Sequence, residues 1–107
     1  MSQTTLDPVA APAEPATRRT PQWHVILWND DTHSYAYVIV MLAKLFGYAP
    51  ERGYQLAKRV DTQGRAVVWT GPREHAELWR DRIRGYGPDP MIRASRSGMR
   101  ADVEEAR

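Results

Sequence analysis

Hydrophobic positions along the chain follow two alternating periods, one typical of strands and the other of helices. Short runs rich in aromatic and β-branched residues, WHVILW from Trp23 and RAVVWTG from Arg65, predict two strands. A third apolar run, MIRAS from Met91, follows a cluster of Gly and Pro residues and predicts a third strand.

Three other segments carry apolar residues three or four positions apart, and residues that start and stop helices bracket each of them. The first helix can begin at any of three residues whose side chains accept hydrogen bonds from free backbone amides. The expected boundaries are Asp31, Thr32 or Ser34 to Gly47, then Pro50 to Gly64, and Pro72 to Gly85. The order β-α-α-β-α-β predicts an α+β fold, with three helices packed on one face of a mainly antiparallel three-stranded sheet.

The length of 107 residues suits one domain with one modest core. Residues 1–21 contain four prolines and no apolar periodicity, so we expect a flexible N-terminal extension. The folded domain is expected to span residues 22–97. Residues 98–107 are expected to form a charged tail of doubtful order.

Composition narrows the range of functions. Fifteen basic residues balance thirteen acidic ones, so charge does not indicate nucleic acid as a partner. Cysteine is absent, and the three histidines show no ligand spacing, so we expect no metal site and no cofactor. The N-terminus lacks the order of a signal peptide, and the longest mostly apolar run is too short to span a membrane. A cytoplasmic protein is the simplest expectation.

The sequence LWNDDTHSY crowds polar groups between the first strand and the first helix. Turn and cap roles explain such residues about half the time, but one cap does not need three of them in succession. Asn29 and Asp30 could hold an ammonium group through an amide oxygen and a carboxylate. A catalytic pair of Asp30 with His33 is not expected, because neighbouring turn residues rarely reach a productive geometry and no nucleophile is recognisable. Asp61 falls at the carboxyl end of the second helix, where the helix dipole disfavours a negative charge.

Three stretches together, VILWNDDTHSYAYVIVMLAKLFGY, ERGYQLAKRVDTQGRAVV and GPREHAELWRDRI, resemble the ClpS family of adaptors for Clp ATPases. The resemblance runs from about Trp23 to Ser97. It implies a non-enzymatic adaptor that binds proteins beginning with a bulky hydrophobic residue and hands them to a hexameric AAA+ unfoldase. It also implies the fold order given above, and a role in delivery for the N-terminal extension.

The resemblance implies a site for each part of such a substrate. The α-amino group would be held by Asn29 and Asp30, with Asp61 beside them. The first side chain would enter a hydrophobic pocket formed by Asp31, Thr32, His33, Tyr35, Val38, Ala57, Val60 and Met91. Glu74 and Trp79 would lie on the surface that docks on the N-terminal domain of a ClpA- or ClpC-like ATPase. The expected partners are therefore this unfoldase and N-degron proteins or peptides that start with Leu, Phe, Tyr or Trp, with no nucleic acid and no membrane, and the adaptor itself is expected to be a monomer.

Four positions depart from the family pattern. Asp61 replaces a histidine, so two carboxylates would surround one cation, and the like charges should raise the proton affinity of one of them. Tyr35 and Ala57 each replace a methionine, so the preferred first residue cannot be carried over. Trp79 replaces a lysine, and its ring could anchor a divergent partner or simply pack.

Two alternatives stay open on the sequence. The chain could dock on the ATPase and regulate it without binding N-degrons. It could also be a small metal-dependent hydrolase that uses Asp30, Asp31, Asp61 and His33, although oxygen-only cation loops usually contain more carboxylates.

Overall fold

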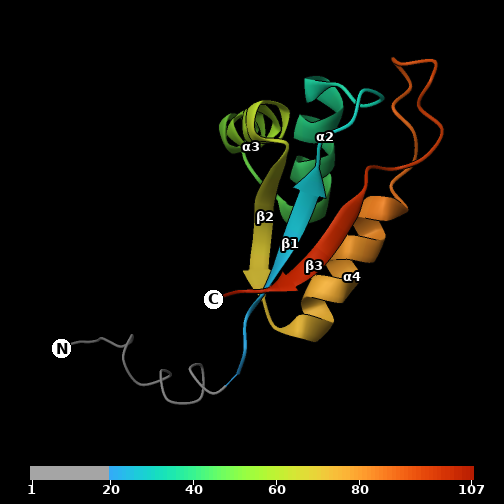
Figure 1. Ribbon diagram of the computed structural model, residues 1–107. Coiled ribbons are helices and arrows are strands. Elements are labelled where there is room, and N and C mark those ends of the chain that lie inside the picture. The colour runs from blue at the N-terminus through green and yellow to red at the C-terminus, as the bar shows by residue number, and fades with distance from the viewer. Residues whose placement is uncertain (1–19) are drawn as a thin grey trace.

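The computed structural model describes residues 20–107, so nearly all of the predicted N-terminal extension lies outside the described residues. The elements follow the predicted order (Figure 1): β1 (Trp23–Trp28), α2 (Tyr35–Phe46), α3 (Pro50–Gln63), β2 (Arg65–Gly71), α4 (Arg73–Arg84) and β3 (Ala101–Glu105). The prediction of an α+β fold with three helices and an antiparallel three-stranded sheet is confirmed. None of the helices in the described part of the chain is long and apolar enough to cross a membrane.

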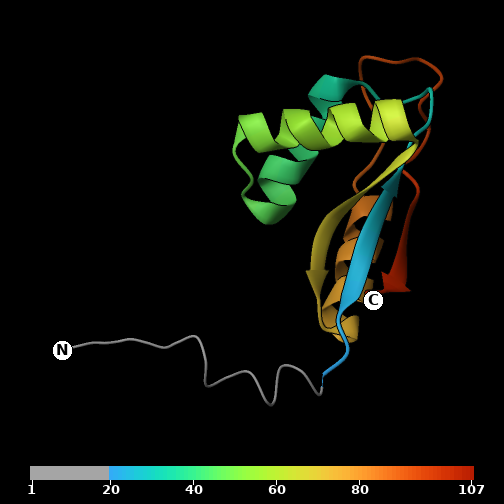
Figure 2. The ribbon, with the colours of Figure 1, turned by 60° about the vertical axis from the view of Figure 1, so that its left-hand side comes forward.

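The sheet has the strand order β2-β1-β3, and both pairings are antiparallel. In the register, Leu27 of the central strand lies between Ala66 and Ala101, and an irregularity interrupts the pairing with β2 between Val25 and Ile26. Helix α4 runs along one face of the sheet, whereas α2 and α3 pack together at the end where β1 finishes (Figures 1 and 2). The loop after β1 therefore opens beside both of these helices.

A single cluster of buried side chains joins the sheet to all three helices. The strands contribute alternate residues to this cluster, because successive side chains of a strand point to opposite faces of the sheet. The cluster includes Val25, Leu27, Ala66, Val68 and Ala101 from the strands and Val38, Met41, Leu42, Leu56, Ala57, Val60, Ala76 and Ile83 from the helices. Buried apolar area of this kind is the main favourable term in folding.

The helix boundaries are those that the sequence predicts. The Ser34 side chain accepts a hydrogen bond from the Tyr37 amide and so caps α2. Gly47 and Gly64 end α2 and α3 with φ angles of 74° and 88°, a conformation that side chains with a Cβ disfavour. Ser34 therefore fixes the first turn of α2 within three residues of the NDD sequence.

The predicted position of the third strand is wrong. Residues 91–95 form turns, and Met91 is 82% exposed. The strand is instead β3, in the segment where we expected a charged tail of doubtful order. Buried Met99 and Ala101 alternate there with charged residues, the pattern of an edge strand that is solvated on one face.

Gly98 allows the chain to reach this strand. A Cβ at this position would lie 2.5 Å from the carbonyl oxygens of Ile83 and Arg84, at the end of α4. Glycine lets the backbone pass against the helix, and Arg84 then donates from Nε to the Ala101 carbonyl oxygen at 2.8 Å. The folded domain thus continues beyond the expected limit at Ser97 and includes β3.

Candidate functional site

A hollow of about 90 Å³ lies where the loop after β1 meets the start of α2 and the end of α3. It brings together nine of the eleven residues that we predicted for the α-amino site and the hydrophobic pocket. Its lining consists of Asn29, Asp30, Asp31, His33, Ser34, Tyr35, Val38, Ala57, Val60, Asp61 and Met99. The lining combines polar groups of the loop and of Asp61 with buried apolar side chains.

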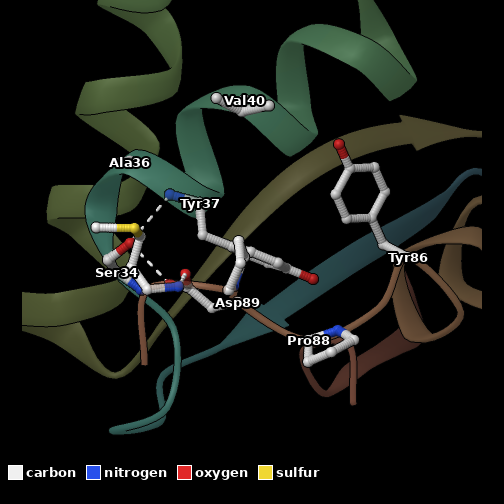
Figure 3. Close-up of a pocket in the computed structure, with 9 residues that line it drawn as sticks. Ser34, Ala36, Tyr37, Val40, Tyr86, Pro88 and Asp89 are labelled. Atoms are coloured by element: carbon white, nitrogen blue, oxygen red, sulfur yellow. Dashed lines mark hydrogen bonds between the residues drawn. The ribbon is translucent and has the colours of Figure 1, made fainter. Parts of the chain in front are cut away.

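Two predicted residues do not line this hollow. Thr32 instead bonds to Asp30 within the loop. Met91 lines a separate apolar hollow of about 310 Å³ between α2 and the segment after α4 (Figure 3). Its expected place is taken by Met99, which is 2% exposed and which sequence reasoning missed because the last strand was misplaced.

Asp30 is fixed by hydrogen bonds from its own loop. Its Oδ1 accepts from the Thr32 amide at 2.8 Å, from the Thr32 hydroxyl at 3.0 Å and from His33 Nδ1 at 2.8 Å, while Oδ2 lies 3.0 Å from the same His33 nitrogen. Burial of the carboxyl works to raise its pKa, but the hydrogen bonds from His33 and Thr32 outweigh burial and hold the pKa below the usual 3.8. Asp30 is therefore a carboxylate at neutral pH. The like charges of Asp30 and Asp61 were expected to raise the proton affinity of one of the two, and Asp30 is not that residue.

His33 links the loop to the segment before β3. Its side chain is 3% exposed, and Nε2 donates to the Ser97 carbonyl oxygen at 2.8 Å. The Ser95 hydroxyl lies 3.2 Å from the same nitrogen. Contrary to our expectation, Asp30 and His33 do meet, and with Ser95 they stand in the order of a catalytic triad.

That arrangement is unsuited to nucleophilic catalysis. A carbonyl oxygen can only accept, so the Ser97 contact requires a proton on Nε2, the nitrogen that would have to take the serine proton. The Ser95 hydroxyl is also engaged as an acceptor of the Asp89 amide at 2.7 Å. The network therefore holds two loops together and does not activate Ser95.

Asp89 anchors the same segment to the start of α2. It is 3% exposed, and its Oδ2 accepts from both the amide and the hydroxyl of Ser34, at 2.7 and 2.8 Å. Figure 3 shows the Asp89 carboxylate against Ser34, below the helix that carries Val40. Burial works to raise the Asp89 pKa, but the hydrogen bonds from the Ser34 and Met91 amides and the Ser34 hydroxyl hold it below the usual value.

Asn29 and Asp61 complete the polar part of the hollow. The Asn29 amide donates to the Gly64 carbonyl oxygen at 2.9 Å, which joins the end of β1 to the end of α3. The Asn29 side chain is exposed and forms no hydrogen bond with any residue in the range 20–107. Asp61, by contrast, accepts a hydrogen bond of 2.7 Å at Oδ2 from the Tyr35 hydroxyl.

Comparison with known proteins identifies the family. A family model described as the ATP-dependent Clp protease adaptor protein ClpS matches residues 18–88. The chain belongs to the ClpS family. The match ends before β3, the segment whose structure the sequence also failed to reveal.

Individual ClpS proteins resemble the chain over most of their length. The adapter protein ClpS of Synechocystis sp. is 37% identical over 68 residues, which cover 63% of this chain and 69% of the relative. ClpS of Mycobacterium tuberculosis is 34% identical over 80 residues, which cover 65% and 79%. The structure of Agrobacterium tumefaciens ClpS2 bound to L-phenylalaninamide has a TM-score of 0.71 and 23% identity, covering 82% of this chain and all of that one. This last comparison shows that the fold is shared.

The two residues predicted to dock on the ATPase have different surroundings on α4. Glu74 is exposed and lines a hollow of about 430 Å³ beside Trp23 and Arg73. Trp79 is partly buried, with its ring centroid 4.6 Å from that of Phe46 and 6.5 Å from that of Trp69. The sequence left open whether the Trp79 ring anchors a partner or packs within the protein, and the structure shows that it packs.

The polar loop does not assemble a metal site. In the described part of the chain no group of three acidic or histidine side chains is placed to hold a metal ion. The site can nevertheless attract a cation, because Asp30 is ionised and the oxygen of the Asn29 side chain is available.

Proposed function

We propose that this Clp protease adaptor captures the free α-amino group of a substrate at Asn29 and Asp30 and takes the bulky, apolar first side chain into the hollow between α2 and α3. One observation carries the proposal. The lining of one hollow combines an ionised carboxylate and an open amide with the apolar side chains of Val38, Ala57, Val60 and Met99. A terminal residue with an ammonium group and an apolar side chain combines these two chemistries.

The energetics suit a delivery protein. A hydrogen bond to a charged group contributes about 1.5 to 3 kcal/mol, and burial of a large apolar side chain contributes roughly 1.5 to 3 kcal/mol. Association and ordering offset much of this gain. The result is a complex that forms selectively and still releases its cargo.

The ligand in the related structure supports this chemistry. L-phenylalaninamide, which is bound to Agrobacterium ClpS2, carries a free α-amino group, an aromatic side chain and an amide in place of a carboxylate. It therefore has the groups of a first residue that continues into a peptide chain. The fold that the two proteins share would offer this chain a comparable place for such a ligand.

Fluorescence anisotropy with labelled peptides tests the proposal. Peptides that begin with Leu, Phe, Tyr or Trp are expected to bind, and N-acetylation of the same peptides should abolish binding because it removes the ammonium group. Asp30→Ala should weaken binding at least about tenfold, since a charged hydrogen bond is lost. Asp81→Ala, which removes an exposed carboxylate on α4, is the matched control and should leave affinity unchanged. Equal binding of free and acetylated peptides would disprove the proposal.

We further propose that Glu74 contributes to docking on the N-terminal domain of a ClpA- or ClpC-like unfoldase. Its exposed carboxylate lies on α4, away from the peptide site. In this proposal the adaptor acts in the cytoplasm as a monomer, catalyses no reaction itself, and uses residues 1–21 during delivery. Glu74→Arg should weaken ATPase binding and leave peptide binding intact. Retained docking with no binding of any free-amine peptide would instead support a regulator that does not recognise N-degrons.

A further inference from the structure

The hollow is too small for the side chain that the proposed function assigns to it. A cavity of roughly 150 Å³ accommodates a benzene ring, whereas this hollow has about 90 Å³. Phenylalanine and the larger aromatic residues therefore need an adjustment of the lining before they can enter. Tyr35 has the largest side chain of the lining and is partly exposed, so its movement can supply the space.

Tyr35 connects the two helices that form the hollow. It is the first residue of α2, and its hydroxyl donates to Oδ2 of Asp61, near the end of α3, at 2.7 Å. Both residues line the hollow, so the bond joins the part of the lining that α2 supplies to the part that α3 supplies. The hydroxyl thereby occupies an oxygen of a carboxylate that could otherwise face the substrate ammonium group.

We propose that Tyr35 is a gate, whose hydroxyl competes with the incoming α-ammonium group for Asp61 and whose ring must move aside before a bulky first side chain can enter. This inference rests on the proposed function and adds a residue that controls access to the site. Each binding event then exchanges the O–H···O⁻ bond of the gate for an N⁺–H···O⁻ bond to the ligand.

The surroundings of Tyr35 make this movement feasible. Its ring centroid lies 5.7 Å from that of Tyr54, which is 44% exposed on α3. The displaced ring keeps an aromatic neighbour at the surface, so opening the gate does not leave it wholly unpacked. The bond to Asp61, followed by burial and the nearby charge of Asp61, raises the pKa of Tyr35 to about 12. The hydroxyl therefore remains a donor throughout the neutral range.

The decisive experiment compares wild type with Tyr35→Phe in anisotropy titrations with a peptide that begins with Phe. Removal of the competing hydroxyl should tighten binding by about three- to tenfold, since one exposed hydrogen bond no longer has to be broken. Tyr54→Phe is the matched control, because it removes a hydroxyl from the neighbouring ring and leaves the Asp61 bond intact. Its affinity should match that of wild type.

The outcomes separate the gate from the function on which it rests. Equal or weaker binding by Tyr35→Phe, with wild type still binding free-amine peptides, overturns the gate and leaves the proposed function standing. Absence of binding by every variant overturns both. A second measurement needs no peptide: the difference in tyrosinate absorbance between a protein and its Tyr35→Phe variant reports the ionisation of Tyr35. Asp61→Asn should make Tyr35 ionise at lower pH, and an unchanged titration would rule out the bond.

Discussion

The Asp89 carboxylate accepts two hydrogen bonds from Ser34, a residue 55 positions earlier in the chain. Ser34 at the same time caps α2 through its hydroxyl oxygen, which accepts from Tyr37. The segment between α4 and β3 therefore determines where the first turn of α2 begins. Because Asp30 and Tyr35 lie on either side of Ser34, the geometry of the proposed peptide site depends on a carboxylate that does not line it.

Asp89→Ala should lower the free energy of unfolding by about 2 to 3 kcal/mol, because it leaves the Ser34 amide and hydroxyl without their buried acceptor. Urea denaturation followed by circular dichroism measures the change. Asp81→Ala serves as the control, because Asp81 accepts a bond from Arg80 at the surface and should contribute little. Similar losses in the two variants would show that Asp89 is not an anchor.

The folded protein should lose stability in acid through Asp30 and Asp89. Burial alone would raise both pKa values, but hydrogen bonds outweigh it and hold both below 3.8 in the folded state. The unfolded chain therefore takes up protons first, and the free energy of unfolding decreases as the pH falls from about 4 through the folded-state values. Above about pH 5 these two groups contribute their full stabilisation.

Urea denaturation at a series of pH values from 7 to 2.5 measures this dependence. Asp89→Asn should be less stable than wild type at pH 7 and should show a shallower decrease in acid, because one of the two titrating groups is gone. Parallel curves for the two proteins would contradict the assignment.

Local signals predicted most of the fold, and long-range contacts account for what they missed. Ser34, Gly47 and Gly64 act on the backbone beside them, so the sequence sufficed to place the helix ends. The last strand was misplaced because its alternation of Met99 and Ala101 with charged residues resembles a solvated tail until the sheet supplies a partner.

In the candidate site, too, the sequence indicated the local features and missed the long-range contacts. Residues within the loop and the facing helices could be assigned by resemblance, and the hollow contains nine of them. The bond from Tyr35 to Asp61 spans 26 positions and the contact of His33 with Ser97 spans 64, and no spacing rule indicates either one. The first joins two positions at which this chain departs from the family pattern, and the second reaches the segment between the strand that was predicted and the strand that is observed.

Asp61→His should change how peptide binding responds to pH. In wild type, carboxylates attract the ammonium group, so binding should persist down to about pH 5 and weaken only as the carboxylates take up protons. A histidine at this position gains a positive charge near pH 6.5 and then repels the ligand. Anisotropy titrations between pH 5 and 8 should show binding that declines earlier in the variant. Coincident pH profiles would show that residue 61 does not face the ammonium group.

Trp79→Ala should act on stability and not specifically on the ATPase interface. The ring packs against Phe46 and Trp69, so its removal should lower the free energy of unfolding by about 2 to 3 kcal/mol. Leu78→Ala is the control on the same helix, because Leu78 is exposed and its loss should change stability by less than about 1 kcal/mol. If Trp79→Ala instead weakened ATPase binding at unchanged stability, the ring would be an anchor for the partner. In that case its packing against Phe46 would be incidental.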